Sequence, residues 1–136
     1  MKHLIALAIV SVLVAACGTT DDDRPRTIEY VVQAITRPYC ANAQCHSAFV
    51  AAGPTFPDGT KVSYSFDSVE NAQISFSGIV VPGDSGASLL YQVLIRSADA
   101  DGNFPRMPYD EPLPDPDKEL IKRWIDEGAD GFTGMQ

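Results

Sequence analysis

Two cysteines and a histidine lie close together in this chain, as Cys40, Cys45 and His46 in the order C-x4-C-H. Any fold must therefore hold two thiols and an imidazole in one neighbourhood. The chain has three cysteines and two histidines in all. The other two, Cys17 and His3, belong to an N-terminal segment with the features of an export signal. We therefore expect His46 to be the only histidine of the mature protein, and the trio to form one site.

The N-terminal segment contains an apolar run over residues 4–13. This run is shorter than the roughly 20 apolar residues that span a bilayer, which favours a secretory signal. The Leu-Val-Ala-Ala-Cys sequence of residues 13–17 then resembles a bacterial lipobox. That resemblance implies a lipoprotein signal peptide over residues 1–16 and a lipid on Cys17, anchoring the protein to a membrane of the cell envelope, at the periplasmic face or in the outer membrane. The alternative is an ordinary signal peptide cut nearby, with Cys17 left as a free thiol.

The rest of the chain has the length of one domain. Residues 17–26 are small, acidic and contain proline, which predicts a flexible lipidated tether. We expect one domain over residues 27–130 and a disordered tail over residues 131–136. The formal charge of the whole chain is −8, and removal of residues 1–16, with one basic and no acidic residue, makes it −9. Nucleic acid is therefore an unsuitable partner, whereas a basic patch on another protein is a suitable one.

Three segments predict helices. Apolar residues over 27–39 recur with helical spacing, and Pro38 is expected to end this helix just before the cysteines. A second helix is expected over residues 87–96. A third begins with Asp115 as its N-cap and ends at Gly128 in the C′ position. Its buried face is expected to contain Leu120, Ile121, Trp124 and Ile125.

The middle of the chain carries a different pattern. Residues 61–66 and residues 73–77 alternate between polar and apolar side chains, which favours short strands. We therefore expect a mainly α-helical domain that leaves room for a small β insertion between residues 60 and 81.

Three kinds of site suit the C-x4-C-H cluster. It resembles the C-x-x-C-H haem-attachment motif of c-type cytochromes, with two more residues between the cysteines; in that family both thiols bond to haem and the histidine binds iron. A Cys40–Cys45 disulfide is the second kind, because exported proteins favour disulfides and the spacing permits one. Zinc is the third, although the sequence offers no obvious fourth ligand.

Two later segments resemble the end of the small cytochrome c domains found in exported bacterial proteins. They are Phe-Pro-Arg-Met-Pro at residues 104–108 and the stretch of residues 119–129, which contains the pairs Trp-Ile and Gly-Ala. The resemblance covers about residues 27–130. It implies a class I, monohaem cytochrome c-like fold in which the N- and C-terminal helices pack together, and it implies that Met107 is the second iron ligand.

Counting the available ligands points the same way. Because His46 is the only histidine expected in the mature chain, a second ligand from this chain cannot be histidine. The thioethers that remain after the signal peptide are Met107 and Met135, and Met135 lies one residue from the end of the sequence. Met107, in a proline-rich loop far along the chain from His46, is therefore the expected partner.

The expected function is one-electron transfer through a single haem c bound by Cys40, Cys45, His46 and Met107. Because both axial positions are filled, we expect no enzymatic activity. The redox partner is not indicated by the sequence. The alternative is a haem-free lipoprotein in which a Cys40–Cys45 disulfide stabilises a structural or binding module.

Overall fold

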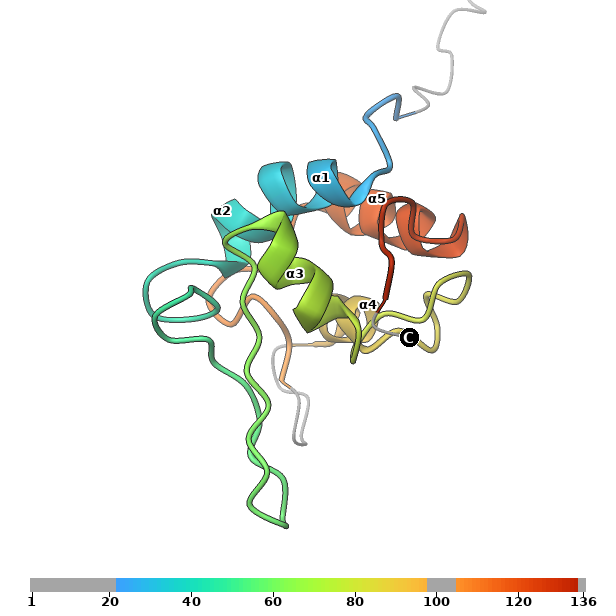
Figure 1. Cartoon of the computed structure of the whole chain (residues 1–136). Coiled ribbons are helices and arrows are strands. Elements are labelled where there is room, and N and C mark those ends of the chain that lie inside the picture. Colours follow the sequence, from blue (N-terminus) through green and yellow to red (C-terminus); the bar gives the residue numbers. More distant parts are fainter. Residues whose placement is uncertain (1–21, 98–104, 135–136) are drawn as a thin grey trace, which may run out of the picture.

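The computed structural model describes residues 22–97 and 105–134, and its elements are helical (Figure 1). The elements are α1 (Ile28–Tyr30), η1 (Val31–Thr36), α2 (Arg37–Cys40), α3 (Val69–Phe76), α4 (Leu89–Ile95) and α5 (Asp115–Asp126). The described ranges contain no strand, so the expected mainly α class is confirmed. No helix in these ranges has the length and apolar character needed to cross a membrane. The expectations for residues 1–16, Cys17 and Met135 lie outside the described residues.

The first helical segment runs through α1, η1 and α2 without a break. Pro38 was expected to end it, but the helix continues to Cys40. Proline interrupts an α-helix because it lacks an N–H group and its ring collides with the carbonyl four residues earlier. Here η1, which precedes α2, forms a wider π-helix, at whose end the amide of Arg37 donates to the carbonyl of Val32. The helix thus passes the proline, and Cys40 is its last residue.

The first and last helices contribute to one core. The start of the first helix is joined to the segment just after α5, because the amide of Ile28 donates to the carbonyl of Asp130 at 3.0 Å. The indole Nε1 of Trp124 donates to the same carbonyl at 3.0 Å. Figure 1 shows α1 beside α5. The α5 residues expected to be buried are all buried, namely Leu120, Ile121, Trp124 and Ile125.

The end of α5 agrees with the sequence. Gly128 has a positive φ of 104°, its amide donates to the carbonyl of Ile125 at 3.0 Å, and the amide of Ala129 donates to that of Trp124 at 2.7 Å. This pair of bonds is a Schellman motif, which satisfies the last carbonyls of the helix. At the other end, Asp115 is the first helical residue and not the cap.

The prediction of a strand over residues 73–77 is wrong, because most of this segment belongs to α3 (Val69–Phe76). The hydroxyl of Ser68 caps the helix by accepting from the amide of Asn71 at 3.1 Å. The alternating pattern placed Ile74 and Phe76 on one face, but Ile74 is 55% exposed while Phe76 is fully buried. The buried side chains instead follow helical spacing, as Ala72, Ser75 and Phe76.

The strand expected over residues 61–66 is also absent, although the segment is paired. An isolated antiparallel bridge joins Thr55 to Lys61. Two further backbone bonds run from Val62 to Pro54 (3.1 Å) and from Tyr64 to Ala52 (3.4 Å). Residues 52–64 thus form an irregular hairpin, which extends away from the helices in Figure 1.

Helix α4 is shorter than the helix expected over residues 87–96. The residue before it, Ser88, is fully buried, and its hydroxyl donates to the carbonyl of Asp84 at 2.8 Å. Because this hydroxyl is used in the preceding turn, it makes no cap bond to α4. The turn also reaches α5, since the amide of Ser85 donates to the carboxylate of Asp126 at 2.9 Å.

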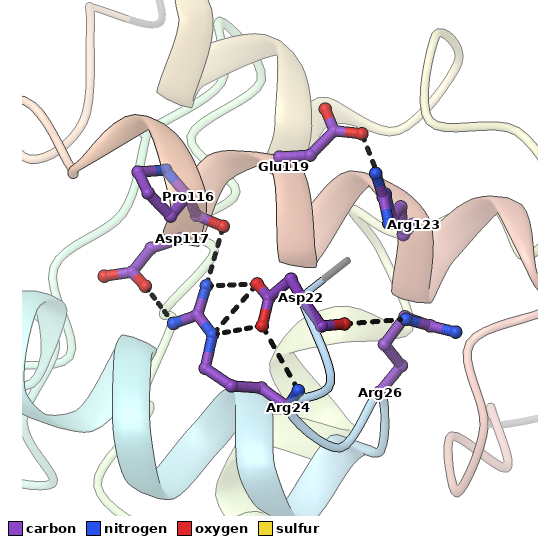
Figure 2. A network of polar contacts seen from close by, with 7 residues as sticks. All are labelled: Asp22, Arg24, Arg26, Pro116, Asp117, Glu119 and Arg123. Carbon is purple, nitrogen blue, oxygen red and sulfur yellow. Dashed lines mark hydrogen bonds and ion pairs between the residues drawn. The ribbon is translucent and has the colours of Figure 1, made fainter. Parts of the chain in front are cut away.

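Residues 22–26, inside the segment expected to be a tether over residues 17–26, are held against the domain through Arg24 and Arg26. Figure 2 shows Arg24 between the carboxylates of Asp22 and Asp117, with a further bond to the carbonyl of Pro116 at 2.9 Å. Arg26 pairs with Glu127 at 2.7 Å. We call these contacts the N-terminal clasp. The clasp raises the pKa of Arg24 and lowers that of Asp22 to about 2, because the two groups are hydrogen-bonded.

Candidate haem site

The four residues expected to bind haem line one cavity. Cys40, Cys45, His46 and Met107 all contribute to a space of about 520 Å³. This volume is within the range of roughly 300–1,000 Å³ that is usual for pockets that bind small molecules and cofactors. The fold therefore brings two segments that are far apart in the sequence to a common site. Most other lining residues are apolar, among them Ala52, Phe66, Ile79, Leu89, Leu90, Val93 and Leu94.

The two cysteines occupy different environments. Cys40 ends α2 and is buried, whereas Cys45 lies in the following loop and is half-buried. Burial, and then the neighbouring Cys45, raise the pKa of the Cys40 thiol to about 12. Both side chains are free thiols in this structure. The wide spacing is accommodated locally, because the amide of His46 returns to the carbonyl of Cys40 at 3.1 Å and closes the loop between them.

The imidazole of His46 is fixed by a backbone contact. Its Nδ1 lies 3.3 Å from the carbonyl oxygen of Tyr64. A carbonyl can only accept a hydrogen bond, so Nδ1 is the donor in this contact, and a neutral imidazole then keeps its lone pair on Nε2. Burial lowers the pKa of His46, while bonds to the backbone at Tyr64 and Ala52 raise it, with burial the larger effect. A neutral imidazole held in this way is the form that binds metal.

Met107 reaches the cavity from the loop before α5. It is half-buried, its peptide bond to Pro108 is cis, and its amide donates to the carbonyl of Val93 in α4 at 2.8 Å. The thioether is a neutral and polarisable group that suits iron in a haem. Phe104, at the start of the same motif, lies outside the described residues.

Sequence reasoning missed two aromatic residues of the site, Tyr64 and Phe66. The ring of Phe66 lies 5.2 Å from that of His46, centre to centre, and Tyr64 supplies the carbonyl described above. The alternation of residues 61–66 was a usable signal, since it puts these two side chains on one side of an extended chain. Beyond Phe66, the rings of Phe76 and Trp124 continue into the core with separations of 5.5 and 5.6 Å.

The carboxylate side chains that line the cavity come from two adjacent residues of the loop before α5. Asp110 and Glu111 line it and are exposed, as is Tyr109 at 73%. The described lining residues include no lysine or arginine. In residues 22–97 and 105–134, no three His, Cys, Asp or Glu side chains come together as a metal site.

The donor set is chemically suited to a covalently attached haem. Two thiols at the end of one helix and in the next loop are available for thioether bonds, and an imidazole and a thioether are available for iron. Apolar side chains surround these groups, as a macrocycle requires. No protein-family model, curated protein or solved structure matches this chain.

Proposed function

We propose that this protein is a one-electron carrier with a single haem c, attached at Cys40 and Cys45 and ligated by His46 and Met107. The observation that carries the proposal is the cavity that all four side chains line, in a mainly apolar environment. A cytochrome c-like arrangement of the helices is part of the proposal. The contact between Ile28 and Asp130, which joins the first helix to the end of the last, supports it.

A haem c bound here would supply a reversible one-electron iron couple. The protein's own residues hold and orient it. The carbonyl of Tyr64 accepts the Nδ1 proton of His46 and would leave Nε2 as the nitrogen that holds iron. Met107 would supply a thioether as the second iron ligand, which raises the reduction potential relative to a second histidine. With two iron ligands from the protein, we propose no enzymatic activity.

The proposed location is the cell envelope, with a lipid on Cys17 that holds the protein on a membrane. Its formal charge, −8 for the whole chain and −9 after removal of residues 1–16, favours a redox partner with a basic surface. Fractionation of cells that express the full chain tests the anchor. Native protein should sediment with membranes, and Cys17→Ala should not.

A second candidate function has one observation in its favour. Cys45 contributes to the raised pKa of Cys40, so the two thiols are neighbours, as a disulfide between them requires. A haem-free protein with that disulfide would be a structural or binding module of the envelope.

One experiment separates the two candidates. The full chain is produced together with haem-attachment machinery, and its visible spectrum is recorded before and after acid–acetone extraction. A Soret band that stays with the polypeptide, with sharp α and β bands on reduction, supports the carrier. The matched control is the third cysteine: Cys17→Ala should keep the covalent haem, whereas Cys40→Ala with Cys45→Ala should lose it. A colourless protein whose mass is two hydrogens below that of the reduced chain overturns the proposal in favour of the disulfide.

A further inference from the structure

Asp110 and Glu111 place two negative charges at the opening of the cavity. Both residues line it and both are exposed, so they lie where the cavity meets solvent. Within residues 22–97 and 105–134, neither takes part in an ion pair, and no lysine or arginine lines the cavity. Among these residues, no ion pair therefore offsets the two carboxylate charges.

The walls of the cavity strengthen the effect of these charges. Most of the side chains that line it are apolar. Charges of one sign in a cleft with apolar walls focus the electric field there, which concentrates ions of the opposite sign and speeds their arrival. A small cation should therefore enter this cavity more readily than a small anion.

Two tyrosines at the same opening also favour cations. Tyr39 is 41% exposed and Tyr109 is 73% exposed, and both line the cavity. The face of an aromatic ring attracts an ammonium or a guanidinium group, and it offers apolar contact as well. We call Tyr39, Tyr109, Asp110 and Glu111 the rim. Its chemistry suits a partner that presents lysine or arginine side chains.

We infer that the rim makes this site selective for cationic electron donors and acceptors, with Asp110 and Glu111 as the specificity-determining residues. The inference rests on the proposed function. It goes beyond the net charge of the chain, because it assigns the preference to two carboxylates at the site itself. In each encounter one electron passes between the partner and the haem iron, so that one is oxidised and the other reduced, and no bond forms or breaks.

The first test measures the charge preference in the haem-free chain, through the thiol of Cys45. The full chain carries Cys17→Ala and is reduced, and the reductant is removed before the reaction. The chain is then treated with one of two methanethiosulfonates, which carry either a trimethylammonium or a sulfonate group. Each forms a mixed disulfide with the thiol and releases methanesulfinate. Peptide mass spectrometry follows Cys45, which is half-buried and lines the cavity, separately from the buried Cys40.

The ratio of the rate with the cation to the rate with the anion reports the charge around Cys45. A change in the reactivity of the thiol itself affects both rates equally, so it leaves this ratio unaltered. The rim variant, Asp110→Asn with Glu111→Gln, removes both carboxylate charges. Its matched control, Asp23→Asn with Glu70→Gln, removes the same charges from exposed residues that do not line the cavity.

We expect the rim variant to lower the rate ratio by about tenfold at low ionic strength, and by less at high salt. The reason is that each carboxylate attracts one reagent and repels the other. The matched control should keep the native ratio.

The second test uses the haem-loaded protein and two one-electron oxidants of equal and opposite charge. They are the tris(phenanthroline)cobalt(III) cation and the hexacyanoferrate(III) anion. Stopped-flow absorption follows oxidation of the ferrous protein. The rim variant should be oxidised more slowly by the cation and faster by the anion, whereas a change in reduction potential would move both rates in the same direction.

Two results overturn the inference and leave the proposed function standing. A rate ratio that the rim variant leaves unchanged would mean that the carboxylates do not act on the space that the reagents enter. An equal fall in the rim variant and in its control would mean that only the net charge of the chain matters. A chain to which no haem attaches overturns the proposed function itself, while the thiol reaction still shows whether the rim attracts cations.

Discussion

The Nδ1 of His46 and the carbonyl oxygen of Tyr64 lie 3.3 Å apart across a gap of 18 residues. The residues between them form the loop after Cys45 and the irregular hairpin, so the orientation of the imidazole depends on that hairpin. A further backbone bond, from the amide of Phe66 to the carbonyl of His46 at 3.0 Å, strengthens the connection.

Gly53 tests this dependence. A Cβ added to Gly53 would lie 1.9 Å from the carbonyl oxygen of Val62, on the opposite arm of the hairpin. We expect Gly53→Ala to separate the two arms and to lower the free energy of unfolding by roughly 1–3 kcal/mol. Gly78→Ala is the control, because its Cβ meets nothing within 4 Å, and its effect should stay within about 0.5 kcal/mol. Urea titrations of both variants provide the measurement, and equal stability of the two would mean that the arms separate freely.

If haem attaches as proposed, Met107 can be tested in the loaded protein. Met107→Ala should remove the sixth ligand, change the spectrum from low-spin to high-spin or water-ligated, and lower the reduction potential, since methionine ligation raises it. Absorption spectroscopy and potentiometric titration measure the two effects. Met135→Ala should change neither. A haem spectrum that Met107→Ala leaves unaltered would remove Met107 from the ligand set.

Phe66 connects the site to the core and should be important for stability. It is 4% exposed and its ring lies 5.5 Å from that of Phe76. Phe66→Ala should therefore cost about 3–5 kcal/mol of unfolding free energy, as is usual for a truncated buried phenylalanine. Phe49 is 98% exposed, so Phe49→Ala should cost little. Denaturant unfolding of the two variants gives the comparison, and a small effect at Phe66 would contradict the packing described here.

Helices with strong periodic patterns were predictable from this sequence. The buried face of α5 and its end at Gly128 were both identified, because four apolar residues with helical spacing are followed by a glycine that adopts a positive φ. The prediction failed at α3. Its five-residue alternation was too short to distinguish a strand from a helix. The contacts that hold α3 in place join it to other segments, as in the bond from Ser75 Oγ to the carbonyl of Ser65 at 2.9 Å.

The site was predictable only in part. Cys40, Cys45, His46 and Met107 carry recognisable chemistry, and the fold places all of them on one cavity. Tyr64 orients His46 through its backbone carbonyl, which any residue could supply, so the residue type at position 64 does not reveal this contact. The course of the helix past Pro38 was also hidden, because it depends on a π-helical turn that ordinary helix rules do not include.

The N-terminal clasp should contribute modestly to stability. The guanidinium of Arg24 bridges Asp22 and Asp117, and the side chain of Asp117 is only 13% exposed. We expect Arg24→Gln to lower the free energy of unfolding by about 1 kcal/mol, and high salt to reduce the difference from the native protein. Arg26→Gln breaks the pair with Glu127, whose side chain is 53% exposed, and should have less effect. Thermal unfolding at low and high salt tests both, and a larger loss for Arg26→Gln would reverse this ranking.

Asp126 predicts how stability changes in acid. Hydrogen bonds from Lys122 first, and then from the backbone and side chain of Ser85, lower its pKa from 3.8 to about 2. Because the folded pKa is depressed, the stabilisation is present above the unfolded value and is lost as the pH falls from 3.8 towards about 2. Asp126→Asn should flatten this part of the profile, and Lys122→Gln should flatten it less. Unfolding measured across this range checks the prediction, and a profile unchanged by Asp126→Asn would contradict it.

If a lipid holds Cys17 on a membrane, as proposed above, the clasp would limit how far the domain can lie from that membrane. The segment that links the lipid to the domain would then end at Asp22, which Arg24 holds, and not at residue 26. The five residues after Cys17, if extended, span at most about 18 Å, roughly half the span of a linking segment that continues to residue 27. The domain would then stay within a thin layer next to the bilayer, where it would meet membrane-bound partners more often than soluble ones. Breaking the contacts of the N-terminal clasp would lengthen the linking segment and widen that layer.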